Sequence, residues 1–178
     1  MPPLVLMTDD ARAADWVEAA AALPAGSAVI VRHRDASARE ALARRLRPLC
    51  AALRIKLLIA DDAGLAFRVR ADGLHLPQAR AAKLAAARRA NGRWLLTTSA
   101  HDRAAVVRAR NADAVFVSPA FTTASHPERA ALGPVRLAAL AAGATNVYAL
   151  GGIDAASIGR LAGTQIAGVA LIGSWVRS

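Results

Sequence analysis

The sequence has a single cysteine, Cys50, and only 4% of its residues are aromatic. One cysteine excludes an internal disulfide bridge, which is typical of proteins from reducing compartments. No apolar run approaches the roughly 18 residues that a transmembrane helix needs, and the first residues lack the basic stretch of a secretory signal. We therefore expect a cytoplasmic protein that does not enter a membrane.

Acidic residues are also scarce, with 13 Asp and Glu against 23 Lys and Arg. The net charge of +10 favours an anionic partner, either a nucleic acid or a phosphorylated small molecule. The arginines are spread over nearly every helical stretch without interleaved aromatic residues, which argues against a surface that stacks on bases. We expect phosphorylated small-molecule substrates and no nucleic acid.

Hydrophobic residues, in contrast, make up 55% of the 178 residues. This content excludes disorder and suffices for one core, so we expect a single domain over residues 1–178. Short apolar runs typical of strands buried on both faces occur at residues 4–7, 28–31, 57–60, 73–76, 94–98, 114–117, 147–150 and 168–172. Helical patterns occupy residues 39–53, 79–90, 102–110, 135–142 and 155–162. Pro48 predicts a kink in the first of these helices, or its division into two.

Strands that alternate with helices predict a parallel sheet, either open and doubly wound or closed into a barrel. Eight strands favour closure, and the α/β fold that we expect is a compact (β/α)8 TIM barrel. In such a barrel the loops that follow the strands build the functional site. The residues after each strand are therefore the candidates for function.

Two arginines follow the second strand. The side chains of Arg32 and Arg34 point to the same side if the chain stays extended. Neighbouring guanidinium groups repel each other unless an anion lies between them, and arginine binds phosphate through two parallel hydrogen bonds. The pair indicates a phosphate or pyrophosphate site, with two solvated arginines as the alternative.

Carboxylates follow the first three strands. Asp9 or Asp10 is expected to cap the helix after the first strand, and Asp35 the helix after the second. Asp61 and Asp62, after the third strand, offer the oxygen ligands that Mg²⁺ prefers, or could cap a helix instead.

Histidine and hydroxyl groups follow the middle strands. His75 alternates with apolar neighbours and is expected to be buried and hydrogen-bonded. The longest loop follows the sixth strand and offers Thr122, Thr123, Ser125 and His126, and long ordered loops are often functional.

Glycines follow the last two strands. Gly151, Gly152 and Gly173 let backbone amides approach a ligand closely. A short helix that starts at Gly173 would point its N-terminus to the same place. Together they predict the phosphate site that recurs after strands seven and eight of barrels.

Several segments occur together in one order along the chain. They are Asp35-Ala36-Ser37 after the arginine pair, Ala71-Asp72-Gly73-Leu74-His75-Leu76 followed by Gln78, Ser99 and His101, Pro119 with Phe121 and Thr123, Gly133-Pro134, and Gly151-Gly152-Ile153. With this set, which spans nearly the whole chain, the sequence resembles the thiamine phosphate synthase family and its sister group, the thiazole tautomerases. The resemblance implies a compact barrel that assembles as a homodimer or another small homo-oligomer. It also implies a transferase that joins hydroxymethylpyrimidine pyrophosphate to a thiazole phosphate carboxylate, with Mg²⁺ as cofactor, and releases pyrophosphate and CO₂.

The resemblance further implies roles for single residues. The catalytic set at the pyrophosphate end would be Arg32, Arg34, Ser99 and His126, and Asp61 would bind Mg²⁺. The substrate-binding set would be Thr123, Ser125, Gly151, Gly152, Gly173 and Ser174, with the glycines around the thiazole phosphate.

The chain departs from the family pattern at the pyrimidine and magnesium end. Ile30 replaces a glutamine, Ala60 replaces an asparagine, Arg80 stands where the second magnesium aspartate is usual, and His126 replaces a lysine. These losses leave two alternatives open. One is a metal-independent, tautomerase-like enzyme with His126 or His101 as the acid and base. The other is a non-catalytic barrel that binds a thiazole or thiamine phosphate.

Overall fold

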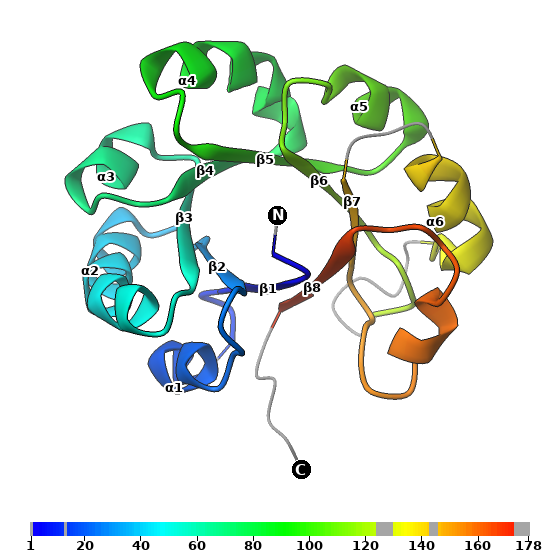
Figure 1. Ribbon diagram of the computed structural model, residues 1–178, viewed down its shortest axis with the longest axis horizontal. Coiled ribbons are helices and arrows are strands. Elements are labelled where there is room, and N and C mark those ends of the chain that lie inside the picture. The colour runs from blue at the N-terminus through cyan, green and yellow to red at the C-terminus, as the bar shows by residue number, and fades with distance from the viewer. Residues whose placement is uncertain (1, 13, 124–129, 143–145, 173–178) are drawn as a thin grey trace.

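The strands of the protein form a closed barrel in a computed structural model that describes residues 2–12, 14–123, 130–142 and 146–172 (Figure 1). Each strand pairs in parallel with the next, and β8 closes the ring against β1. The strands are β1 (Leu4–Met7), β2 (Ala28–Val31), β3 (Lys56–Ala60), β4 (Gly73–Leu76), β5 (Leu95–Ala100), β6 (Ala114–Val117), β7 (Val147–Leu150) and β8 (Gly168–Ile172). The expectation of a compact (β/α)8 barrel is confirmed.

Alternate residues of the strands build two separate cores. Val5 and Met7 point into the barrel, whereas Leu6 between them packs against the helices outside. The inner core also holds the rings of Phe116 and Tyr148, whose centroids lie 5.2 Å apart. The barrel is therefore filled by side chains, as small barrels are, and its loops at the ends of the strands remain for ligands.

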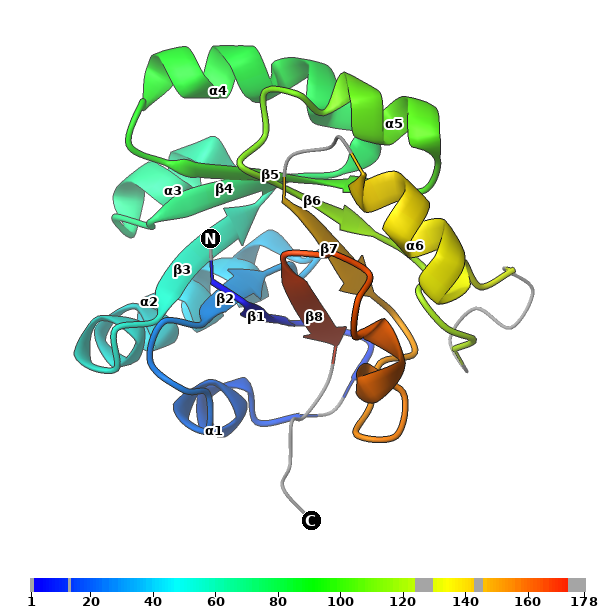
Figure 2. The same ribbon diagram turned by 45° about the vertical axis from the view of Figure 1, so that its right-hand side comes forward.

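Helices cover the outside of the barrel (Figure 2). They are α1 (Trp16–Ala21), α2 (Ala36–Ala52), α3 (Ala63–Arg68), α4 (Leu84–Ala90), α5 (Arg103–Arg108) and α6 (Gly133–Ala141), with 3-10 turns η1 (Gln78–Lys83) and η2 (Ile158–Leu161). The sequence patterns did not reveal α1 and α3, which have only six residues each. They also predicted one α-helix over 79–90, where the chain instead begins as η1, and a full helix over 155–162, where only η2 forms.

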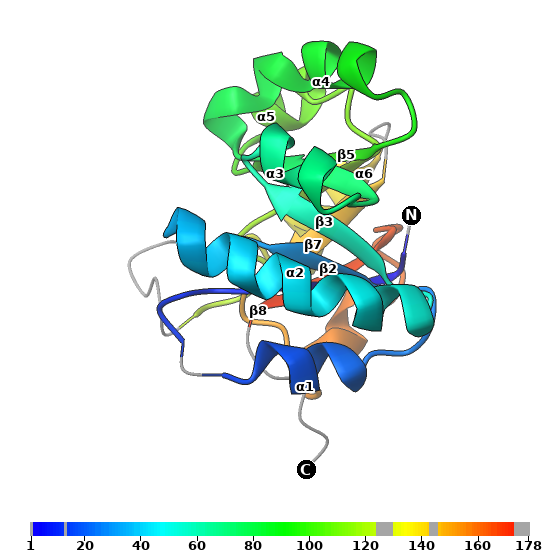
Figure 3. The same cartoon turned by 90° about the vertical axis from the view of Figure 1, so that its left-hand side faces the viewer.

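The longest helix, α2, lies across β2 and β3 with α1 beside it (Figure 3). Pro48 was expected to kink this helix or to divide it in two, and the division is wrong, because the structure has one helix of 17 residues. Proline removes one backbone donor, yet Leu42, Leu46 and Cys50 keep one face of the helix buried on both sides of it. No helix among the described residues is long and apolar enough to cross a membrane.

The strands are also fixed where they begin, at the end of the barrel that we call the bottom. Asp72, just before β4, accepts hydrogen bonds from the Leu57 amide of β3 at 2.9 Å and from Arg47 of α2 at 2.9 Å. Two strands further on, Asp113 repeats the arrangement with the amide of Leu96 and with Arg88. Each carboxylate thus joins one helix to two neighbouring strands.

Candidate functional site

A cavity of about 580 Å³ opens at the opposite end of the barrel, the top, where the strands end. Residues after β1, β2, β5, β6 and β7 line it, together with residues of β4 and β8. Five of the residues predicted from the sequence lie in its wall: Arg32, Ser99, Thr123, Gly151 and Gly152. Arg34 and Asp61 do not line it. The top of the barrel therefore gathers both the expected arginine and the expected glycines.

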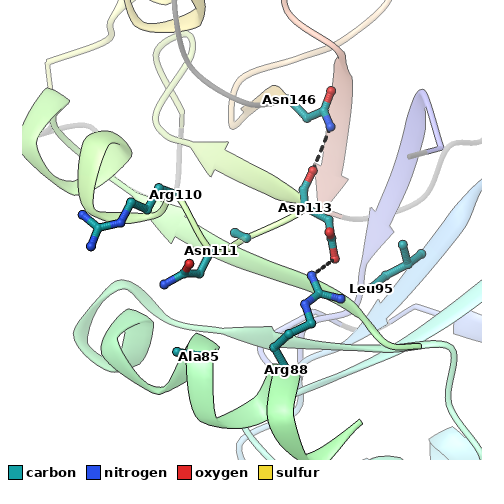
Figure 4. Close-up of a pocket in the computed structure, with 8 residues that line it drawn as sticks. Ala85, Arg88, Leu95, Arg110, Asn111, Asp113 and Asn146 are labelled. Carbon is teal, nitrogen blue, oxygen red and sulfur yellow. Dashed lines mark hydrogen bonds and ion pairs between the residues drawn. The ribbon is translucent and has the colours of Figure 1, made fainter. Parts of the chain in front are cut away.

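A second hollow, of about 670 Å³, lies at the bottom (Figure 4). Three of its polar side chains already serve the fold. The guanidinium of Arg88 donates to Asp113 at 2.6 Å, and Asn146 donates to the carbonyl of Asp113 (Figure 4). Arg88 also donates to the carbonyl of Trp94 at 2.8 Å. We therefore place the functional site at the top, where polar side chains from several strands converge.

Arg32 is held at the rim of the cavity by the loop after β1. Its Nη2 donates to Asp9 Oδ2 at 2.9 Å and its Nε to the carbonyl of Thr8 at 3.3 Å. Asp10 accepts the backbone amide of Arg34 at 2.7 Å. The expectation that Asp9 or Asp10 caps the next helix is wrong, because the α1 cap is Asp15 and the two carboxylates are drawn to β2.

Only one arginine of the pair reaches the cavity. Arg32 lines it, whereas Arg34 is exposed and does not line it. His33 between them is buried, with its ring edge-on to that of Trp16. The structure therefore does not bring both arginines to one anion in the cavity.

Asp61 is paired with a cation. It has a positive φ of 60° at the end of β3, and its Oδ1 lies 2.8 Å from Arg80 Nη1. The neighbouring Asp62 turns away, accepts the amide of Leu65 at 2.8 Å as the cap of α3, and pairs with Arg39 at 3.2 Å. The capping alternative for Asp62 is therefore the one that the structure bears out.

These donors do not fit a magnesium site. Mg²⁺ needs oxygen ligands in near-octahedral geometry, and the described residues contain no cluster of three or more His, Cys, Asp and Glu side chains that could hold a metal. At Asp61, Oδ1 accepts a hydrogen bond from the guanidinium of Arg80, and this positive charge repels a dication. We therefore derive no step of the chemistry through a metal.

His75 is buried in the floor of the cavity, as expected. Its Nδ1 lies 2.9 Å from Thr97 Oγ1 and its Nε2 lies 3.1 Å from Ser99 Oγ. Burial, with a smaller contribution from the charge of Arg32, lowers the pKa of His75 to about 3. The imidazole is therefore neutral near pH 7, and its hydrogen bond to Ser99 holds that hydroxyl in the cavity.

His101 is the other histidine in the cavity wall. Its Nδ1 lies 3.1 Å from the carbonyl of Ser118 and 3.3 Å from Ser118 Oγ. Its backbone amide donates to Gln78 Oε1 at 2.8 Å, which ties η1 to the end of β5. Unlike His75, His101 is exposed and can reach a bound ligand.

The glycines after β7 form a turn that no other residue can adopt without strain. Gly151 and Gly152 have φ values of +92° and +68°. A Cβ on Gly152 would lie 2.6 Å from the carbonyl oxygens of Phe121 and Thr122, so the loop after β6 rests directly on this turn. Among the described residues, no hydrogen bond uses the amide of Gly152. The turn can therefore present an amide to an anion.

Sequence analysis missed several other residues of the cavity wall. Asp9, Arg12, Ser118 and Asp154 line it as well. Their position in a loop that follows a strand could have indicated a functional role, but helix capping explains polar residues at such positions equally well. Four predicted site residues, Ser125, His126, Gly173 and Ser174, lie outside the described residues.

The comparisons with known proteins identify the family. Residues 4–174 match the family model described as thiamine monophosphate synthase. The chain belongs to this family. A thiamine-phosphate synthase of Chromobacterium violaceum is 35% identical over 172 residues, which covers 93% of this chain and 82% of that protein. A putative thiamine-phosphate synthase of Geobacter sulfurreducens is 38% identical over 154 residues, covering 81% and 70%.

A solved structure supports the fold of this thiamine monophosphate synthase family member. The thiamine phosphate pyrophosphorylase of Pyrococcus furiosus superposes with a TM-score of 0.80, covering 96% of this chain and 86% of its own, at 20% identity. The expectation of a thiamine phosphate synthase-like transferase is confirmed at the level of the family.

Proposed function

We propose that the protein joins hydroxymethylpyrimidine pyrophosphate to a thiazole phosphate carboxylate and so forms thiamine phosphate. The bond between the pyrimidine methylene carbon and the pyrophosphate oxygen breaks, and its electron pair leaves with pyrophosphate. The thiazole nitrogen then bonds to the methylene carbon, and the carboxylate is lost as CO₂. Both substrates are phosphorylated, which fits the positive charge of the chain.

The glycine turn after β7 is the proposed cradle for the thiazole phosphate. Gly151 and Gly152 line the cavity, and the free amide of Gly152 among the described residues can donate to a phosphate oxygen. Thr123 lies beside them, because its Cγ2 is 3.4 Å from the place where a Cβ of Gly151 would be. Phosphate binding here needs no metal, because amides alone supply the donors.

Arg32 and Ser99 are the proposed binding groups for pyrophosphate inside the cavity. Negative charge develops on pyrophosphate as it leaves, and preorganised donors that face this charge are the largest source of rate enhancement in such reactions. Arg32 is fixed by Asp9 and Thr8, and Ser99 is fixed by neutral His75. Neither group has to reorganise when charge appears.

The observation that carries this proposal is the single cavity that contains both the fixed arginine after β2 and the glycine turn after β7. Purified protein should convert the two substrates to thiamine phosphate, measured by chromatography of the product. Arg32→Gln should lower kcat by more than tenfold, because a charge-assisted hydrogen bond contributes about 1.5–3 kcal/mol. The absence of product with both substrates bound would overturn the synthase proposal.

Gly152→Ala tests the cradle separately. The new Cβ would collide with two carbonyl oxygens at 2.6 Å, so we expect binding of the thiazole phosphate to be lost. Gly26→Ala is the matched control, since Gly26 also has a positive φ, of +84°, but no atom within 4 Å of the added Cβ. Unchanged binding in Gly152→Ala would place the phosphate elsewhere.

A second candidate function, tautomerisation of the thiazole phosphate alone, is favoured by the exposed imidazole of His101 in the cavity. A histidine can both accept and donate a proton, which suits a proton transfer within one substrate. Proton exchange into the thiazole phosphate, followed by NMR in D₂O, would detect this activity. It should fall in His101→Asn or in His126→Asn, and exchange at the wild-type rate in both variants would exclude the candidate.

A further inference from the structure

The rim of the barrel holds a second arginine, Arg80, whose side chain is paired with the carboxylate of Asp61. Asp61 directly follows β3 and Arg80 lies in η1, after β4, so the two residues come from neighbouring parts of the rim. Their side chains meet at 2.8 Å. Two positions 19 residues apart are thus in direct contact.

Backbone contacts fix both partners of this pair. The amide of Asp61 donates to the carbonyl of His75 at 2.8 Å, which holds the end of β3 against β4. Gln78, at the start of η1, accepts the amide of His101 at 2.8 Å and so joins η1 to the end of β5. Arg80, two residues later, reaches back across the end of β4 to Asp61.

The free donors of Arg80 are suited to an anion. A guanidinium has five N–H groups, and among the described residues only Asp61 is bonded to that of Arg80. Half of the Arg80 side chain is exposed, so a ligand in solvent can reach it. Arginine binds phosphate oxygens through parallel hydrogen bonds and stays charged at all working pH values.

We propose that the guanidinium of Arg80, held by Asp61, replaces a divalent cation and binds the pyrophosphate group of the substrate without Mg²⁺. Arg80 would extend the pyrophosphate site of Arg32 along the rim, over the ends of β3 and β4. A fixed cation at this place would neutralise charge on the leaving group as a metal does. Asp61 then orients an arginine and does not bind a metal.

This inference rests on the proposed function, since pyrophosphate is a product of that reaction. It can nevertheless be tested by binding alone. The experiment is calorimetric titration of the full chain with inorganic pyrophosphate, in EDTA and in Mg²⁺. The variants are Arg80→Gln, which removes the charge, and Arg80→Asp, which places a second carboxylate beside Asp61. Arg89→Gln is the control, since Arg89 is exposed in the last turn of α4, outside the cavity.

We expect the wild type and Arg89→Gln to bind pyrophosphate equally in EDTA. Arg80→Gln should bind it at least tenfold more weakly, as the loss of a charge-assisted hydrogen bond predicts. Arg80→Asp should not bind in EDTA and should regain binding when Mg²⁺ is added, because two carboxylates then meet where a cation is needed.

Two results would overturn the inference. One is wild-type binding that requires Mg²⁺, and the other is binding by Arg80→Gln with wild-type affinity in EDTA. Failure of the proposed function is a different result: the wild type would bind pyrophosphate through Arg80 in EDTA and yet form no thiamine phosphate from the two substrates.

Discussion

The two ends of the barrel use the same pairing of arginine with aspartate for different purposes. At the bottom, Asp72 and Asp113 each accept a strand amide as well as an arginine, so both partners belong to the framework. At the top, among the described residues, the carboxylate of Asp61 accepts a hydrogen bond from Arg80 and from no strand amide. The guanidinium of Arg80 keeps donors that no other described residue uses.

The difference shows how one interaction can serve either stability or binding. A carboxylate that accepts a buried amide cannot be removed without leaving that amide unsatisfied. A carboxylate that contacts only an exposed guanidinium contributes little to stability but fixes the direction of a positive charge. Removal of Asp72 or Asp113 at the bottom should therefore cost more stability than removal of Asp61 at the top.

Mild acid should lower the free energy of unfolding through His75 at the top of the barrel, and this is the largest effect that we expect. His75 has a pKa of about 3 in the folded protein against 6.5 for the ordinary side chain. The unfolded chain therefore binds a proton at a higher pH than the folded one, and stability falls as the pH drops from 6.5 towards 3. Between pH 6.5 and 4.5 the loss should be about 2–3 kcal/mol, measured by urea unfolding.

The histidine responsible can be identified by substitution. His75→Gln should remove most of this pH dependence, whereas His101→Asn, at an exposed histidine of the same cavity, should retain it. A wild-type stability that stays constant between pH 6.5 and 4.5 would show that His75 is not held neutral by the fold.

Asp72→Ala should destabilise the protein at pH 7, through the bottom of the barrel. The substitution removes the partner of Arg47 and of the Leu57 amide, and we expect a loss of about 1–3 kcal/mol in the free energy of unfolding. Asp61→Ala is the matched change at the top and should cost only about 0–1 kcal/mol. Urea unfolding of the two variants gives the comparison directly, and equal losses would remove the distinction between the ends.

The sequence predicted the barrel well because strand burial leaves a local pattern. Continuous apolar runs such as residues 28–31 and 114–117 coincide with observed strands. The short helices α1 and α3 were missed because six residues give too few turns for a recognisable periodicity. Pro48 does not divide α2 in two, since packing on both sides of it outweighs a local preference.

The site was predicted less completely, for a reason visible at two residues. Asp61 and Arg34 follow strands and have suitable chemistry, yet neither lines the cavity. Which way a side chain turns at a strand end depends on its tertiary partner. Arg80 draws Asp61 aside, and no local pattern encodes a contact between residues 19 positions apart.

Stronger acid should protonate Asp72 at the bottom of the barrel and so lower the free energy of unfolding. This is the smallest of the three stability effects that we expect. Burial opposes ionisation of Asp72, but the Leu57 amide and Arg47 outweigh it and hold the pKa of the carboxyl below its ordinary 3.8. The ionised form therefore stabilises the fold above pH 3.8, and this contribution is lost as the pH falls through the lower, folded pKa.

The measurement needs His75→Gln as the background, so that the histidine is not titrated at the same time. In that background, the difference in stability between Asp72 and Asp72→Asn should be constant from pH 7 to about pH 4 and should shrink below it. A difference that stays constant in stronger acid would mean that the Asp72 charge contributes nothing, and that its hydrogen bond to the Leu57 amide alone fixes the start of the strand.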